Sequence, residues 1–149
     1  MLRIRLFLVL RALLVALIGM MALAGVSPAA ASTTLRSHSL VTCSARGCNG
    51  KDPQATGCAA DARTVQTAVL RTAFVQLRFS RTCGTNWGRV ISRVGLAHLF
   101  VRIDRIDGLS FFGSISTGVL VFSPMVFAPV VKARACGTVK GVSGCTAFV

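Results

Sequence analysis

Six cysteines constrain the fold of this chain more than any other feature, because all of them follow an apolar N-terminal segment. Three of these, Cys43, Cys48 and Cys58, surround a turn-rich segment at residues 49–53, and Cys83 comes later. An even number of cysteines in an exported domain is typical of a disulfide framework. The sequence therefore predicts a compact domain whose loops are held together by disulfides.

The N-terminal segment has the features of a secretory signal. Three arginines flank an uncharged apolar core at residues 12–26, and an Ala-x-Ala cleavage site lies just before Ser32. We therefore expect a signal-peptide helix within residues 1–31, cleavage after Ala31, and a secreted, extracellular or cell-wall-associated protein exported by the Sec route. The alternative is an N-terminal membrane anchor, because residues 12–31 are uncharged and long enough to span a bilayer.

The remaining chain is long enough for one domain. Residues 32–42 are expected to form a loose N-terminal arm, and residues 43–149 a single disulfide-linked β domain. Residues 108–131 carry no charge, which could be mistaken for a membrane span. Their glycines, prolines and short apolar runs favour buried strands instead.

Alternation of apolar and polar residues predicts strands. Residues 74–80 place Val75, Leu77 and Phe79 on one face. A second apolar row is formed by Ala97, Leu99, Val101 and Ile103, opposed by His98, Arg102 and Asp104. Further strands are predicted at residues 64–69, 87–94, 109–112, 119–122 and 125–131, with a hairpin turn at Asp107–Gly108. The predicted fold class is all-β, a small antiparallel sandwich or barrel stapled by disulfides.

The positive charge of the chain favours anionic partners. The formal net charge is +13, and it is +10 without the three arginines of the signal segment. Such a field attracts cell-wall polymers and anionic membrane surfaces. The basic residues are scattered, so a generic basic surface remains the alternative to a dedicated site. Specific nucleic-acid binding is not expected, because one Trp and no Tyr leave few aromatic side chains to stack on bases.

Residues suited to catalysis are few. His98 and Asp104 share a strand face, but six residues of strand separate them by roughly 20 Å, too far for a hydrogen bond. The chain contains no nucleophile-elbow, zinc-protease or phosphate-loop motif. No catalytic residue and no cofactor is therefore assigned.

The cysteine-rich segment resembles a bacterial family known as domain of unknown function 2690. The family pattern runs Cys-x4-Cys-x-Gly-Lys-Asp-Pro, Thr-Gly-Cys, Leu-Arg-Tyr-Ser, and then Cys and Trp. Phe79 replaces the usual Tyr, and Gly88 stands where Ala is common. The matching residues are Cys43, Cys48, Gly50, Lys51, Asp52, Pro53, Thr56, Gly57, Cys58, Leu77, Arg78, Ser80, Cys83 and Trp87. The resemblance extends through residues 43–149 and implies a compact secreted domain without a known activity.

Three charged residues of the matched motif, Lys51, Arg78 and Arg89, are the candidates for binding an anion. Their alternative role is purely structural. Trp87 is expected to pack on a disulfide, while Gly50 and Gly57 suit turns.

The cysteine spacing predicts a Cys136–Cys145 bridge across a glycine-rich hairpin loop. Six cysteines permit fifteen connectivities, and among the others Cys43–Cys48 and Cys58–Cys83 are favoured. A zinc site is the alternative, because Cys43 and Cys48 have a suitable ligand spacing, and Cys58 and Cys83 would complete four thiolates. Export to an oxidising compartment weighs against zinc.

Taken together, the sequence predicts a secreted or cell-surface bacterial protein, a non-enzymatic module that binds an anionic envelope polymer. The alternative is a small secreted hydrolase that acts on a polyanion. Neither the ligand nor the oligomeric state follows from the sequence.

Overall fold

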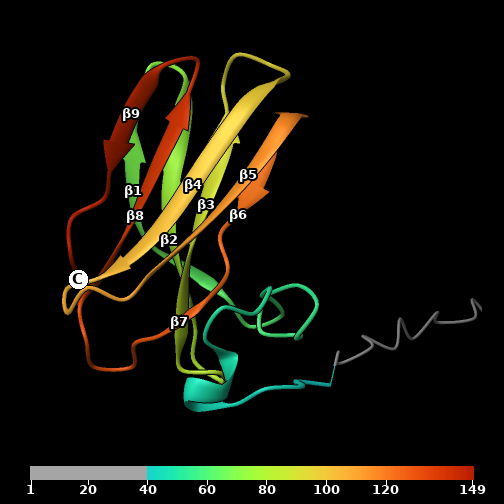
Figure 1. Cartoon of the computed structure of the whole chain (residues 1–149), viewed down its shortest axis with the longest axis vertical. Coiled ribbons are helices and arrows are strands. Elements are labelled where there is room, and N and C mark those ends of the chain that lie inside the picture. The colour runs from blue at the N-terminus through green and yellow to red at the C-terminus, as the bar shows by residue number, and fades with distance from the viewer. Residues whose placement is uncertain (1–39) are drawn as a thin grey trace, which may run out of the picture. The chain divides into compact units, whose positions relative to one another are not determined.

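The computed structural model describes residues 40–149, which form two antiparallel β-sheets and one short 3-10 helix (Figure 1). The signal helix and most of the loose arm were predicted for residues outside this range. Among the described residues, no helix is long and apolar enough to cross a membrane. The elements are η1 (Ala45–Cys48), β1 (Arg63–Val69), β2 (Ala73–Ser80), β3 (Thr85–Ser92), β4 (Ala97–Arg105), β5 (Ser110–Gly118), β6 (Leu120–Phe122), β7 (Val126–Phe127), β8 (Ala133–Val139) and β9 (Val142–Cys145).

The strands are divided between two sheets that pack face to face (Figure 1). The first sheet has the order β1-β2-β3-β6, with β7 also paired to β3, and the second has the order β5-β4-β8-β9. The predicted all-β class is confirmed. Of the two predicted architectures, a sandwich and a barrel, the structure is a sandwich.

The core between the sheets is built from the predicted alternating rows. Val75 and Leu77 of β2 and Leu99, Val101 and Ile103 of β4 have no exposed surface and belong to one apolar cluster. Burying each such side chain contributes about 1.5–3 kcal/mol to folding. The alternation therefore decides which face of each strand points inward, and the polar residues between them are left on the outer faces.

Three predicted strands differ clearly in extent from the structure, and β8 and β9 were not predicted. The strand predicted at 125–131 is reduced to β7, because Pro124 and Pro129 have no N–H to donate to a neighbouring strand. The strand predicted at 109–112 extends as β5 to Gly118. The strand predicted at 87–94 begins earlier, at Thr85, because its pairing with β2 continues to the turn between them.

A glycine in β3 lets the two sheets approach closely at the centre of the sandwich. A Cβ atom on Gly88 would lie 2.6 Å from Cγ2 of Val101 on the opposite sheet, which is closer than two carbon atoms can pack. This approach fixes the middle of β3 against the core, and the neighbouring Trp87 and Arg89 are carried on the other face of the strand.

Candidate anion-binding site

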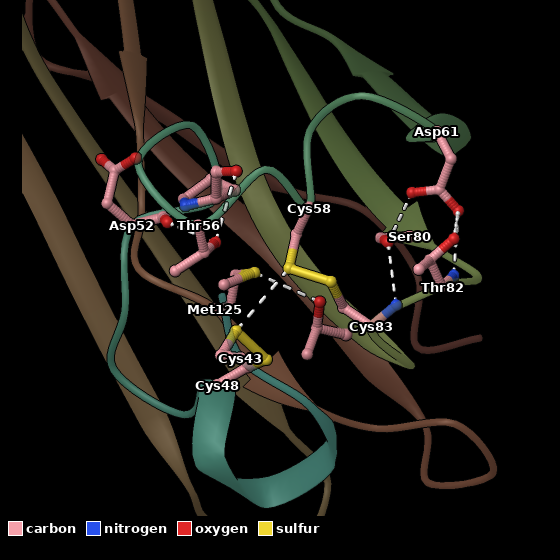
Figure 2. Close-up of a disulfide and its surroundings, with 12 residues drawn as sticks. Cys43, Cys48, Asp52, Thr56, Cys58, Asp61, Ser80, Thr82, Cys83 and Met125 are labelled. Carbon is pink, nitrogen blue, oxygen red and sulfur yellow. Dashed lines mark hydrogen bonds between the residues drawn. A yellow bond between two sulfur atoms is a disulfide. The ribbon is translucent and has the colours of Figure 1, made fainter. Parts of the chain in front are cut away.

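The six cysteines form the three disulfides that the sequence analysis favoured. No described cysteine is free. The bridges are Cys43–Cys48, Cys58–Cys83 and Cys136–Cys145, with S–S distances of 2.07, 2.00 and 2.05 Å. The third disulfide joins directly opposed residues of β8 and β9. The four cysteines considered as zinc ligands are thus paired in two disulfides, which lie side by side (Figure 2).

These two disulfides form a second, smaller core on the outer face of the first sheet. Trp87 is only 1% exposed and packs in a cluster with Cys48, Cys58, Cys83 and Met125. The predicted packing of Trp87 on a disulfide is therefore confirmed. Its indole N–H is buried without a hydrogen-bond partner among the described residues. The cluster attaches the cysteine-rich loop to β3 independently of the core between the sheets.

Backbone hydrogen bonds fix the start of this loop. The N–H of Gly50 donates to the carbonyl of Met125 at 2.9 Å, and the N–H of Met125 donates to the carbonyl of Lys51 at 2.9 Å. Gly50 has a φ of +73°, a conformation that glycine adopts without strain. A carboxylate oxygen of Asp52 accepts hydrogen bonds from the backbone N–H groups of Gln54 and Ala55 at 2.7 and 2.9 Å. The predicted turn at residues 49–53 is therefore held at both ends.

Asp61 holds the end of the loop beside the Cys58–Cys83 disulfide (Figure 2). Its carboxylate accepts from the hydroxyl of Ser80 at 2.6 Å and from the backbone N–H of Thr82 at 2.9 Å. Burial alone would raise the pKa of Asp61, but the hydrogen bonds from Ser80 and Thr82 outweigh it and lower the pKa below its ordinary value. The ionised carboxylate thus fastens the loop to the turn between β2 and β3.

The register of β2 and β3 brings two of the predicted anion-binding residues together. Arg78 lies opposite Trp87, and Gln76 lies opposite Arg89. The two arginines are therefore diagonal neighbours on the outer face of the sheet. Partial burial and the charge of Arg89 lower the pKa of Arg78, and partial burial lowers the pKa of Arg89. Both guanidinium groups stay charged at neutral pH.

Neutral acceptors orient both guanidinium groups. Arg78 donates to the hydroxyl of Thr64 at 2.6 Å and to the carbonyl of Ala62 at 2.8 Å. The Nε–H of Arg89 donates to the amide oxygen of Gln76 at 2.7 Å. The terminal nitrogens of Arg89 donate to no acceptor within residues 40–149. The two charges are therefore held in place without being neutralised.

All the acidic side chains of the chain are engaged elsewhere. The sequence contains only four, of which Asp52 and Asp61 bind within the loop region as described. Asp104 forms ion pairs with Arg102 at 2.8 Å and with Arg134 at 3.2 Å, and Asp107 pairs with Arg105. No carboxylate side chain remains to neutralise the two arginines of the first sheet.

A pocket of about 290 Å³ opens beside these two arginines. Its walls come from the cysteine-rich loop on one side and from β2, β3 and β6 on the other. The lining residues are Gln54, Gly57, Ala59, Ala60, Arg78, Trp87, Arg89 and Phe122. Two cations in a partly desolvated pocket form strong, charge-assisted hydrogen bonds with an anion. This region is therefore a candidate anion-binding site.

The other candidate residues lie apart from this pocket. Lys51 is exposed and does not line it, although its backbone anchors the loop to Met125. His98 is exposed on β4. Asp104, the carboxylate on the same strand face, is bound by two arginines and by the hydroxyl of Ser110 at 2.8 Å. The structure brings together Arg78 and Arg89 only.

Two residues of the site were not identified from the sequence. Gln76 orients Arg89, and Gln54 lines the pocket from the loop. The alternation along residues 74–80 placed Gln76 on the same face as Arg78, which was a usable signal. No sequence signal pointed to Gln54, because its position depends on the path of the loop.

A family model described as "Protein of unknown function (DUF2690)" matches residues 46–136. This range includes the cysteine-rich loop from residue 46 onward, both arginines of the pocket and the strands that carry them. Neither a curated protein nor a solved structure matches the chain.

Proposed function

Because the chain belongs to the DUF2690 family of proteins of unknown function, we propose its role from the chemistry of the pocket. The protein is a secreted or cell-surface bacterial module that has no catalytic activity of its own. It binds an anionic polymer of the cell envelope through Arg78 and Arg89.

A single observation carries this proposal. Two neighbouring arginines share a pocket, are oriented by neutral acceptors, and have no carboxylate partner among the described residues. Keeping two like charges close together in a partly buried place costs free energy unless a counter-ion compensates. A bound phosphate or carboxylate group would supply that compensation.

The size and setting of the pocket favour a polymeric ligand that inserts one charged group at a time. A volume of about 290 Å³ is at the lower end of the range for small-molecule sites. The neighbouring Phe122 and Trp87 provide apolar walls beside the two cations. The positive charge elsewhere on the protein would raise the local concentration of a polyanion and accelerate its association.

A binding assay with several polyanions tests the proposal. The exported protein is mixed at low salt with phosphate-rich wall polymer, heparin, DNA or vesicles containing anionic lipid, and bound protein is separated by sedimentation. We expect binding to wall polymer without shortening of the polymer chains. Cleavage of the polymer would identify a hydrolase instead, and preference for the vesicles would indicate the membrane surface as the partner.

A further inference from the structure

The sulfur atoms of two disulfides form a single cluster on the outer face of the first sheet (Figure 2). The Sγ atoms of Cys43, Cys48, Cys58 and Cys83 all lie within 4.8 Å of one another. Sγ of Cys43 and Sγ of Cys58, which belong to different disulfides, are 3.7 Å apart. The four cysteines come from η1 with its flanking residues, the loop, and the turn between β2 and β3.

We propose that reduction of these two disulfides converts the cluster into a binding site for one Zn²⁺ ion. Structural zinc is held by four thiolates in a tetrahedron, with Zn–S distances of about 2.3 Å. The sulfur atoms of such a tetrahedron are about 3.8 Å apart. The 3.7 Å between the Sγ atoms of Cys43 and Cys58 already matches this spacing. The two bonded pairs reach it by side-chain rotation once their S–S bonds are broken.

The chemistry balances with a dithiol as the reductant. Each disulfide gains two electrons and two protons from one dithiol, which leaves as its own disulfide. The resulting four thiols then release four protons as Zn²⁺ binds their thiolates. With four thiolates and one Zn²⁺, the site carries a net charge of −2.

Zinc would connect the same segments that the disulfides connect. Cys48, Cys58 and Cys83 are buried, so the metal would be shielded from water and from competing ligands. With the metal in place of the two crosslinks, the hydrogen bonds that join the loop to Met125 would be retained. Reduction in the presence of zinc therefore leaves the loop attached to the sheet. The inference is independent of anion binding, because Arg78 and Arg89 take no part in it.

Metal analysis of the reduced full-length protein tests the inference. The protein is reduced without oxygen, freed of reductant, given excess Zn²⁺ and desalted, and the zinc retained per chain is measured. Co²⁺ is substituted in parallel, because thiolate coordination gives it a charge-transfer absorption. We expect one metal ion per chain, and circular dichroism that matches the oxidised protein.

Two matched variants decide which cysteines are responsible. Cys136→Ser/Cys145→Ser removes one disulfide and two thiols away from the cluster, and it should still retain one zinc per chain. Cys43→Ser/Cys48→Ser removes a disulfide of similarly short span, and it should retain none. Equal zinc binding by both variants would overturn the inference. Failure of the reduced parent and of the reduced Cys136→Ser/Cys145→Ser variant to retain zinc would overturn it too.

Discussion

Each sheet of the sandwich carries a pair of arginines on its outer face, and the two pairs differ in their partners. Arg102 of β4 and Arg134 of β8 both bind the carboxylate of Asp104. Arg78 of β2 and Arg89 of β3 bind neutral oxygens only. The second sheet therefore compensates part of the charge of its pair with one carboxylate, whereas the first sheet presents two uncompensated charges beside a pocket.

This difference indicates that the arginines of the second sheet stabilise the fold, whereas those of the first sheet are available to a ligand. The hydrogen bonds and ion pairs around Asp104 outweigh its desolvation and lower its pKa, so the ionised form stabilises the fold. Burial lowers the pKa of both arginines of the first sheet, which means that the folded protein disfavours their charge. Charges that are retained at a cost to folding are typical of functional sites.

The largest expected effect is the loss of the loop that forms one wall of the pocket. The Cys58–Cys83 disulfide spans 25 residues, and closing such a segment contributes about 3.5 kcal/mol by chain entropy. We expect Cys58→Ser/Cys83→Ser to lower the free energy of unfolding by about this amount and to abolish anion binding. Denaturant unfolding followed by circular dichroism measures the change. Unaltered anion binding in this variant would show that the loop is not needed for the anion-binding site.

A smaller loss of stability is expected at the compensated pair. Asp104→Asn removes the charge that binds two arginines and the hydroxyl of Ser110. We expect a decrease of about 1–2 kcal/mol in the free energy of unfolding at pH 7, with no change in anion binding. Chemical denaturation of both proteins at pH 7 measures it.

The acid dependence of stability provides the control for this variant. Because the pKa of Asp104 is lowered from 3.8 in the folded state, its stabilisation is complete above pH 3.8 and is lost as the pH falls through the lower, folded-state value. Asp104→Asn should therefore lose less stability than the parent between pH 5 and pH 2. Parallel stability curves for the two proteins over this range would show that the ion pairs contribute nothing.

The smallest change in stability is expected at the uncompensated pair. Arg89→Gln removes one of two neighbouring like charges and keeps a polar side chain, at the cost of one hydrogen bond to Gln76. We expect the free energy of unfolding to change by less than about 0.5 kcal/mol, while anion binding weakens. Thermal and denaturant unfolding measure the stability. A loss as large as that of Asp104→Asn would assign Arg89 a structural role.

Local sequence patterns were sufficient to predict β2 and β4 and their inward faces, but they missed the core strand β8, where small residues such as Ala133 and Ala135 form no clear apolar row. The alternation from Ala97 to Ile103 was regular because that strand is buried on one side only. The same reasoning underestimated β5, where Gly113, Ser114 and Thr117 weaken the pattern. The pairing of β5 with β4 extends that strand, and such pairing depends on residues far apart in the sequence.

The candidate site could be predicted only in part. Arg78 and Arg89 were identified through the matched motif, but their proximity results from the register of β2 and β3, which no local pattern specifies. Lys51 was grouped with them because it belongs to the same motif, whereas the fold places it outside the pocket. The lack of a carboxylate partner became visible only when the contacts of all four acidic residues were known.

The claim that the first sheet binds an anion through its uncompensated arginines is tested most directly by titration with wall polymer. Binding is followed by isothermal titration calorimetry, because Trp87, the only tryptophan of the chain, packs on two disulfides that quench indole fluorescence. The parent protein is compared with Arg78→Gln/Arg89→Gln and with the matched control Arg102→Gln/Arg134→Gln, first at low salt and then at increasing salt. Circular dichroism confirms that all three are folded.

We expect Arg78→Gln/Arg89→Gln to bind at least about 100-fold more weakly, because each charged hydrogen bond contributes about 1.5–3 kcal/mol. The control should lose less than about 3-fold, and binding by the parent should weaken steeply with salt. Equal losses in the two variants would instead indicate a diffuse basic surface without a site. An absence of binding by the parent at low salt would contradict the claim entirely.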